Sequence, residues 1–509
     1  MKKAFYKQLC RRCGLILLAL SILLTLFGCT KAENAADLGY MENMTDAGNM
    51  LPQDGEYDTT ASENGTPILV ENPFITTQEE PISTFSADVD TASYTYFRKL
   101  VTNNYSLNDL KSFGANFRTE EFINYFKYQA NAPKEGELFG VTTAIAPCPW
   151  NNQTLLMRLT LQAESAVKSQ GNNLVFLIDV SGSMSASDKL PLLKKTFSYL
   201  VSQLGEQDRV SIVTYSGAEK VVLSGCPGNK GEKILNAINN LDAGGSTNGQ
   251  SGLEKAYNLA QDYMIEGGNN RIIMASDGDL NVGISSAEEL KAFVEQKRDL
   301  GIYLSILGFG TGNYRDANME ALADNGNGVY YYIDGETEAE RIFGTELLST
   351  LYTVANDVKL QITFDPAAVA SYRLIGYENR ILNKEDFTDD TKDAGEVGAG
   401  HQVTVCYELT PAETLPETEN WMTLKVRYKP NGANESVENQ YPIGKKDQKE
   451  PTDDFRFVTA LIETAMVLHN SKYLGDINLH NVLDILNQLD LSEQPLRREF
   501  KSLIQKIAQ

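Results

Sequence analysis

Two serines follow an aspartate at the end of a strongly apolar stretch, LVFLID. Asp179 ends that stretch, and Ser181 and Ser183 follow it in the string Asp-Val-Ser-Gly-Ser. Two similar places occur later, because Thr247 lies in the glycine-rich GGSTNG and Asp277 ends the apolar run RIIMASD. All five side chains offer oxygen atoms, the ligands that Mg²⁺, Mn²⁺ and Ca²⁺ prefer. Two carboxylates balance one divalent cation and three neutral hydroxyls leave it electrophilic, so Mg²⁺ is favoured, with Mn²⁺ or Ca²⁺ as alternatives.

The same residue types also begin helices, so the pattern alone is weak. Asp, Ser and Thr are preferred N-cap residues, and an Asp-x-Ser-x-Ser string also arises by chance. The metal-site interpretation therefore depends on whether the three loops meet. In a sheet of parallel strands, the loops that follow the strands gather at one edge, and ligands bind there.

Short apolar strands and amphipathic helices alternate regularly from residue 173 to about 355. Runs such as RIIMASD and IYLSILGF are separated by helical stretches such as KLPLLKKTFSYLVSQL and SGLEKAYNLAQDYMI. Strands this apolar, separated by helices, indicate a parallel sheet covered on both faces. We therefore predict an α/β domain over residues 173–355 with a doubly wound, mostly parallel, Rossmann-like sheet. Its last helix, at about 336–355, would lead directly into the strand VKLQITF.

Strands without intervening helices lie on both sides of this domain. Residues 67–172 include GVTTAIAPC and TLLMRLTLQA, and residues 356–450 include HQVTVCYEL and WMTLKVRY. We predict that the two regions pair in one β-rich domain into which the α/β domain is inserted. Residues 451–509 have the pattern of three helices, and a Thr/Asp cap in TDDFRF begins the first of them.

The first 28 residues have the pattern of an export signal. Five Lys or Arg and no acid precede a thirteen-residue apolar run, LILLALSILLTLF, which is too short to span a bilayer as a helix. The junction Leu-Phe-Gly-Cys resembles a bacterial lipobox, in which the signal is cut before the cysteine and the cysteine takes a lipid such as palmitate. We predict residues 1–28 as a signal peptide, a lipid on Cys29, and a flexible acidic tether over residues 29–66. The alternative is a signal anchor with an incidental cysteine.

Composition excludes several classes of function. The net charge of −23 argues against a nucleic-acid partner, which requires clustered Lys and Arg. The chain has three histidines and no HExxH motif, which removes the commonest zinc hydrolase pattern. Beyond the lipobox only Cys148, Cys226 and Cys406 remain, so at most one disulfide can form. We therefore predict that the protein is not an enzyme, and a metal-dependent hydrolase is the least favoured function.

The predicted metal-binding residues resemble the metal-ion-dependent adhesion site (MIDAS) of von Willebrand factor type A domains. DVSGSM, the threonine of GGSTNG and the aspartate of SDGD carry this resemblance. Beyond them, STFSADVDTASYTYFRKL, RTEEFINYF, APCPWNNQTLLMRLTL and NSKYLGD resemble bacterial lipoproteins with this domain (YfbK-like), over about residues 74–509. The resemblance implies that Ser181, Ser183 and Thr247 contact the metal, while Asp179 and Asp277 bind it directly or through water. A partner's Asp or Glu would take the sixth position.

The function implied by the resemblance is binding of a protein partner. We predict an exported module, anchored by lipid to the cell membrane or the outer membrane, whose Mg²⁺ binds an exposed Asp or Glu of an unknown protein. The alternative is a scaffold that assembles other proteins of the cell envelope. Related domains can couple ligand binding to a shift of the last helix, so binding could be transmitted to the β-rich base.

Overall fold

The computed structural model describes residues 60–61, 67–166, 170–216, 219–245, 250–278, 287–310, 316–414, 420–433 and 435–509. Three predictions therefore fall outside the described residues: the signal peptide, the lipid on Cys29 and the position of Thr247. Of the predicted tether, only the strand β1 (Thr60–Ala61) is described, and it pairs with β2 (Pro67–Ile68).

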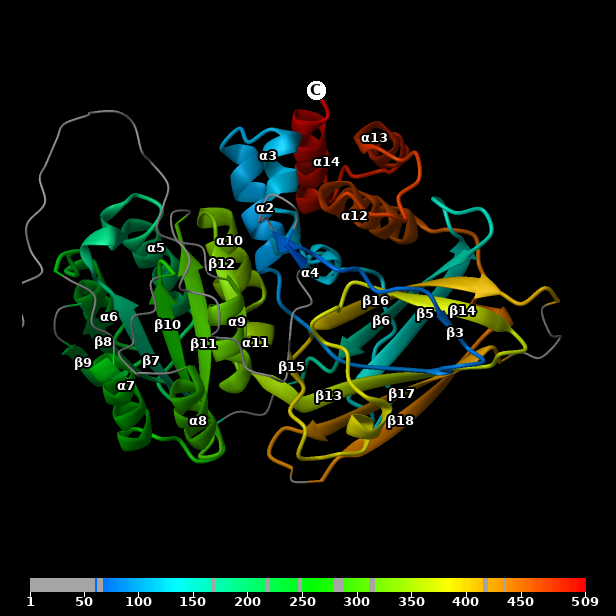
Figure 1. Ribbon diagram of the computed structural model, residues 1–509. Coiled ribbons are helices and arrows are strands. Elements are labelled where there is room, and N and C mark those ends of the chain that lie inside the picture. Colours follow the sequence, from blue (N-terminus) through cyan, green and yellow to red (C-terminus); the bar gives the residue numbers. More distant parts are fainter. Residues whose placement is uncertain are drawn as a thin grey trace, which may run out of the picture. The chain divides into compact units, whose positions relative to one another are not determined.

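A six-stranded sheet forms the centre of the α/β domain (Figure 1). Its strands lie in the order β12-β11-β10-β7-β8-β9, and every neighbouring pair is parallel except the antiparallel pair β8–β9. The predicted fold class, a doubly wound and mostly parallel sheet inserted in a β-rich domain with helices at the C-terminus, is confirmed. The six strands are β7 (Asn172–Asp179), β8 (Arg209–Tyr215), β9 (Lys220–Pro227), β10 (Asn269–Ser276), β11 (Ile302–Phe309) and β12 (Tyr330–Ile333).

Helices cover both faces of this sheet, because successive residues of a strand point to opposite sides. Phe176 of β7 stacks on Phe197 of α5 with ring centroids 4.2 Å apart. Its neighbour Leu177 faces α7, where a Cβ atom added at Gly252 would lie 3.4 Å from Leu177 and 3.0 Å from Tyr215. Gly252 thus lets α7 approach the sheet closely. The helices are α5 (Leu190–Ser202), α6 (Gly231–Asn239), α7 (Gln250–Asp262), α8 (Ala287–Arg298) and α9 (Asp316–Asn325).

Two antiparallel sheets pack face to face in the β-rich domain, and each contains strands from both sides of the α/β domain. β4 pairs with β13, whereas β3 pairs with β14 and β6 with β16. One sheet has the order β3 (Ile75–Thr76), β14 (Val369–Ile375), β16 (Gln402–Pro411), β6 (Leu155–Ala163), β5 (Phe139–Pro147). The other has the order β15 (Gly395–Gly398), β13 (Thr353–Phe364), β17 (Met422–Pro430), β18 (Val437–Ile443), with β4 (Ile82–Ser86) also on β13.

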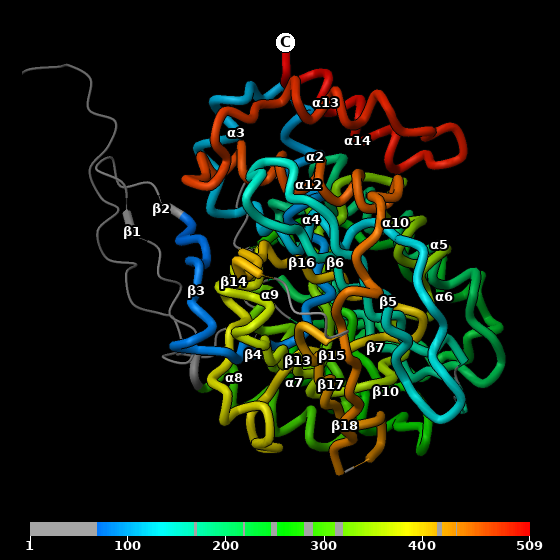
Figure 2. Tube along the Cα trace, turned by 90° about the vertical axis from the view of Figure 1, so that its right-hand side faces the viewer, coloured from blue at the N-terminus to red at the C-terminus, as the bar shows by residue number. Residues whose placement is uncertain are grey.

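Helices from both ends of the described chain share one aromatic core above the sheet that contains β6 and β16 (Figure 2). Phe126, which follows α4, contacts Tyr94 of α2 at 5.0 Å and Phe457 of α12 at 4.8 Å between ring centroids. The predicted threonine cap of α12 is present, because Thr452 accepts a hydrogen bond from the backbone N–H of Phe455. These helices are α2 (Ala92–Thr102), α3 (Leu107–Ser112), α4 (Thr119–Asn124), α12 (Asp453–His469), α13 (Leu479–Asn487) and α14 (Pro495–Ile507).

The single helix predicted at about 336–355 is wrong. The structure has α10 (Glu336–Glu340), one π-helical turn η3 (Arg341–Thr345) and α11 (Leu347–Leu351), and β13 follows at once. The backbone N–H of Glu346 bonds to the carbonyl of Arg341, and the buried Arg341 guanidinium pairs with Glu338 at 2.5 Å and Glu346 at 2.7 Å. The wider turn lets one arginine reach a carboxylate on each side, a contact that hydrophobic periodicity does not reveal.

Two further findings concern the described parts of the chain. Cys148, Cys226 and Cys406 are all buried and free. No helix among the described residues is both long and apolar enough to cross a membrane.

Candidate metal centre

The first two predicted ligands lie at the ends of neighbouring strands. β7 and β10 pair in parallel register, with Ile178 opposite Ala275, so both strands end at the same edge of the sheet. Asp179 is the last residue of β7, and Asp277 follows the last residue of β10. Their exposed fractions are 0% and 4%. A buried carboxylate needs a compensating charge or several hydrogen bonds, so this edge of the sheet requires partners.

The loop after β7 folds back on Asp179. The backbone N–H of Ser181 donates a 2.8 Å hydrogen bond to Asp179 Oδ1, and the hydroxyl oxygens of Ser181 and Ser183 lie 3.0 Å apart. Ser181 is buried and Ser183 is exposed. The turn that holds them is the short 3₁₀-helix η2 (Gly182–Ser185). The loop therefore gathers one carboxylate and two hydroxyls, one of them on a buried serine and the other on an exposed serine.

The loop that leads toward Thr247 is hydrogen-bonded to this turn. The backbone N–H of Gly244 donates to the carbonyl of Val180 at 2.8 Å, and the N–H of Gly182 donates to the carbonyl of Gly245 at 3.2 Å. Thr247 itself lies outside the described residues, and its predicted role stays a prediction.

Asp277 has a partner that was not predicted from the sequence. Lys189, directly before α5, donates a 2.8 Å hydrogen bond from Nζ to Asp277 Oδ2. The other oxygen, Oδ1, is buried without a hydrogen-bond partner among the described residues. Gly310 makes room for the lysine, because a Cβ atom there would lie 2.3 Å from Lys189 Cε. No pattern in the sequence marks Lys189, which lies 88 residues before Asp277.

The donor set at this edge fits a divalent cation. It contains carboxylate and hydroxyl oxygens, which are hard ligands suited to Mg²⁺, Mn²⁺ or Ca²⁺. The buried Oδ1 of Asp277 has an unfilled acceptor position, and a cation would satisfy it. The ammonium group of Lys189 compensates part of the negative charge at Asp277 in the structure.

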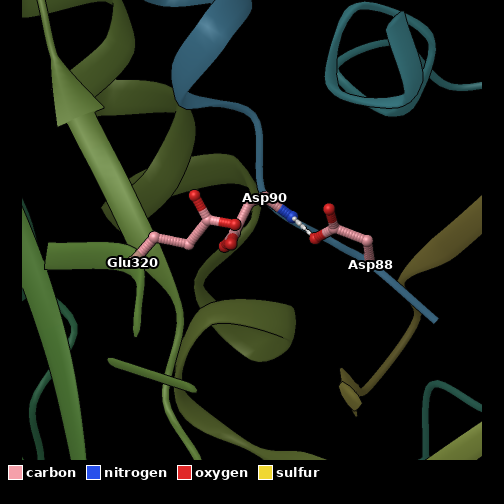
Figure 3. A group of neighbouring side chains, drawn as sticks. All are labelled: Asp88, Asp90 and Glu320. Atoms are coloured by element: carbon pink, nitrogen blue, oxygen red, sulfur yellow. Dashed lines mark hydrogen bonds between the residues drawn. The ribbon is translucent and has the colours of Figure 1, made fainter. Parts of the chain in front are cut away.

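A second group of carboxylates lies where the segment before α2 meets α9. Asp88, Asp90 and Glu320 each place one carboxylate oxygen within 4.8 Å of the others, and all three are buried. Figure 3 shows Asp90 facing Glu320, while the backbone N–H of Asp90 donates to Asp88 Oδ1 at 3.0 Å. The sequence analysis did not identify these residues as a cluster.

Arginines compensate the charge of this second group. The Arg380 guanidinium lies 3.0 Å from Glu320, 3.4 Å from Asp90 and 3.5 Å from Asp88, and it also pairs with Asp324 at 2.6 Å. Burial, followed by the neighbouring carboxylates, raises the pKa of Asp90 well above its usual value, while the same carboxylates raise the pKa of Arg380. The arrangement is an internal ion-pair network that joins the segment before α2, helix α9 and the loop after β14.

Comparison with protein-family profiles matches the chain in three successive stretches. Residues 64–158 match "von Willebrand factor", and residues 173–345 match "von Willebrand factor type A domain". Residues 349–509 match "Uncharacterized protein YfbK, C-terminal".

Individual proteins show the same relationship. "Uncharacterized protein YfbK" of Escherichia coli K12 is 37% identical over 462 residues, which cover 86% of this chain and 79% of that protein. The human inter-alpha-trypsin inhibitor heavy chain H3 is 28% identical over 178 residues, covering 33% of this chain and 20% of that one. The solved structure of a von Willebrand factor type A protein from Catenulispora acidiphila is 15% identical, with a TM-score of 0.42 over 74% of this chain and 91% of that chain.

The match to the E. coli protein covers most of both chains, and the two largest profile matches correspond to the inserted α/β domain and to the C-terminal region that follows it. The chain therefore belongs to the YfbK family, with a von Willebrand factor type A domain inserted in its β-rich domain.

Proposed function

We propose that the α/β domain is a metal-dependent protein-binding module whose cation, held at the ends of β7 and β10, binds an acidic residue of a partner protein. One observation carries the proposal. Asp277 is 4% exposed, and its Oδ1 is buried without a hydrogen-bond partner among the described residues, at the sheet edge where Asp179 and the two serines also lie. An acceptor left in this state is costly, and a cation is the ligand that it fits.

The proposed roles of the residues follow from their chemistry. Asp179 and Asp277 would supply charge, while Ser181, Ser183 and Thr247 would supply neutral oxygens. When bound, Mg²⁺ offers an electrophilic position to a carboxylate from outside the chain. Because Ser183 is an exposed residue, we infer that the site is open on the side from which a partner would approach.

We also propose that this module works outside the cytoplasm, attached to a membrane by a lipid on Cys29. The support is the pattern of the first 29 residues: a basic start, a short apolar run and a lipobox-like junction. The proposed function is binding rather than catalysis. His401, His469 and His480 lie in the β-rich domain or the helices beside it, so among the described residues no histidine accompanies Asp179 as a general base.

Calorimetric titration of the purified protein with Mg²⁺, Mn²⁺ and Ca²⁺ tests the proposal. We expect saturable binding of Mg²⁺ that is lost in Thr247→Ala and weakened in Ser183→Ala. Ser185→Ala is the matched control, because Ser185 is an exposed serine of the same 3₁₀ turn that the proposal does not assign to the metal.

The same titration with a short aspartate-containing peptide tests the partner chemistry. We expect the peptide to bind in the presence of Mg²⁺ and not in the presence of a chelator, and its asparagine counterpart not to bind. Mg²⁺ binding that is unchanged in Thr247→Ala and in Ser183→Ala would contradict the proposed site. Equal binding of the aspartate and asparagine peptides would contradict the proposed partner.

A further inference from the structure

A cavity of about 810 Å³, separate from the metal centre, lies between the β-rich domain and the C-terminal helices. Its walls come from the segment after α4, from strands β5 and β6, and from the first turns of α12 and α14. This volume is within the range of small-molecule binding sites, about 300–1,000 Å³. The predicted metal-binding residues are not part of its lining.

One wall of the cavity is formed by a buried arginine, two of whose nitrogens have no hydrogen-bond partner among the described residues. Arg158, in the middle of β6, is only 4% exposed, and its Nε and Nη1 have no hydrogen-bond partner among the described residues. A guanidinium group carries five N–H donors, and burying them unpaired is expensive. The aromatic ring of Tyr128, 5.5 Å from Arg158 Cζ, supplies a cation–π contact and no acceptor oxygen in the plane of the fork.

The nearest carboxylate is already bound by other donors. Asp454 Oδ2 lies 3.8 Å from Arg158 Nη1, which is too far for a hydrogen bond. That oxygen accepts a 2.7 Å bond from the backbone N–H of Gln129, and Oδ1 accepts a 2.7 Å bond from Arg497 Nη2. Of the two arginines that flank Tyr128, Arg497 thus has a carboxylate partner at hydrogen-bond distance and Arg158 does not.

The remaining surroundings favour an anion with a single charge. The first turns of α12, 17 residues long, and α14, 13 residues long, line the cavity, and the N-terminus of a helix carries a partial positive charge. The lining also contains two lysines, two arginines and an equal number of carboxylates. This balance disfavours a multiply charged anion such as phosphate. The planar fork of arginine matches a carboxylate, which it can bind through two parallel hydrogen bonds.

We propose that this cavity binds a small organic carboxylate of about the size of a short peptide, with its carboxylate on Arg158. The ligand supplies the two acceptor oxygens that the arginine lacks. Exposed Asp453 and Glu450, also in the lining, lie on the solvent side and accept a positive or amide-bearing end of the same ligand. The C-terminus of a peptide has this combination of groups, and so does a free carboxylic acid with polar substituents.

Calorimetric titration of the purified protein with the peptide Ala-Ala-Ala, with its C-terminal amide, with lactate and with inorganic phosphate tests this inference. We expect Ala-Ala-Ala to bind saturably and the amide to bind at least tenfold more weakly, because the amide cannot form the charged pair. Lactate binding more tightly than Ala-Ala-Ala would identify a free acid as the source of the carboxylate. No saturable binding of either carboxylate at millimolar concentration would overturn the inference, and so would preferential binding of phosphate.

Variants of Arg158 locate the binding. Arg158→Met removes the charge and is expected to weaken Ala-Ala-Ala binding by about tenfold or more, the effect of losing a charge-assisted hydrogen-bonded pair. Arg158→Lys keeps the charge without the planar fork, so we expect a smaller loss.

Arg209→Met is the matched control and leaves binding unchanged. Arg209 is a half-buried arginine of β8 whose hydrogen bonds among the described residues go to backbone carbonyls. If Arg158→Met does not fold, the free-acid and amide comparison in the unaltered protein decides the result. Equal affinity of the unaltered protein and a folded Arg158→Met for Ala-Ala-Ala would show that the cavity is not the site.

Discussion

Two of the groups of buried carboxylates among the described residues have charges that are compensated in different ways. Asp88, Asp90, Glu320 and Asp324 surround the guanidinium of Arg380, which lies 2.6 to 3.5 Å from all four. At the ends of β7 and β10, two carboxylates share the edge of the sheet with hydroxyl groups, and Lys189 reaches only one oxygen of Asp277. In the first group Arg380 approaches every carboxylate, although Asp88 Oδ2, 3.5 Å from Arg380 Nε, has no hydrogen-bond partner among the described residues. The second has an acceptor position that the described residues leave open.

This difference separates a structural cluster from a binding site. A guanidinium fixed inside an ion-pair network cannot be exchanged for a ligand without a large loss of stability. A single lysine on a long side chain, 15% exposed, can move away when a divalent cation arrives. Carboxylate clusters of similar composition are therefore distinguished by the cation already present and by how many of their oxygens it satisfies.

The largest expected effect is on the arginine network. Arg380→Met leaves three buried carboxylates and the partly exposed Asp324 without their shared cation. We expect the free energy of unfolding to fall by about 3–5 kcal/mol. Urea unfolding measures this change. Arg456→Met, which alters an arginine whose side chain is 46% exposed, is the control and should stay within about 0.5 kcal/mol of the unaltered protein. A loss below about 1 kcal/mol would mean that the network contributes little to stability.

At the metal centre we expect a substitution to change metal affinity strongly and the free energy of unfolding little. Asp179→Asn keeps the shape and the acceptor for the Ser181 N–H but removes a charge, so we expect Mg²⁺ affinity to fall about a hundredfold, or about 3 kcal/mol of binding. Unfolding without metal should change little. Asp188→Asn, in the same loop and paired with Lys99 at 3.2 Å, is the control for binding. A large loss of stability together with unchanged metal affinity in Asp179→Asn would reverse the distinction between the two groups.

A pH titration sharpens the comparison. Burial and the adjacent carboxylates raise the pKa of Asp90, so the folded state holds this proton more tightly than the unfolded state. Its contribution to stability is full below the ordinary pKa of an aspartate and is lost as the pH rises through the raised pKa. We expect the unfolding free energy to decrease as the pH rises above about 4, the ordinary pKa of an aspartate, and Asp90→Asn to make that decrease smaller.

Asp299→Asn is the control for this pH effect, because the Asp299 side chain is 70% exposed, and it should leave the slope unchanged. Mg²⁺ affinity, measured in parallel on the unaltered protein, should increase as the pH rises, whereas the free energy of unfolding should decrease. Protons compete with the cation for the carboxylates, so Mg²⁺ binding weakens as the pH falls. An identical pH slope in Asp90→Asn and in the unaltered protein would show that Asp90 does not titrate in this range.

The sequence predicted the elements of the site better than their compensating charges. Apolar runs that end in Asp179 and Asp277 predicted parallel strands whose ends meet, since the hydrophobic pattern is local and the carboxyl ends of parallel strands lie at one edge of a sheet. The pairing of Arg380 with Asp90 joins residues 290 positions apart, and no periodicity connects them. Lys189 and Arg158 are likewise ordinary residues of a helix start and a strand. Their roles depend on which oxygens the folded chain brings to them or withholds from them.

The smallest expected effect concerns the lysine at the metal centre. Its ammonium competes with a cation for Asp277 Oδ2 and repels a second positive charge nearby. Lys189→Met keeps most of the aliphatic packing against Gly310 and removes this competition. We expect Mg²⁺ affinity to increase by about three- to tenfold, or about 1 kcal/mol, in calorimetric titration. Lys194→Met, on α5 with its ammonium on the carbonyls of Asn239 and Leu241, is the matched control. Weaker Mg²⁺ binding in Lys189→Met would instead mean that the lysine holds Asp277 in the position that binds the cation. The orientation of Asp277 Oδ1 would then depend on the hydrogen bond from Lys189 to Oδ2.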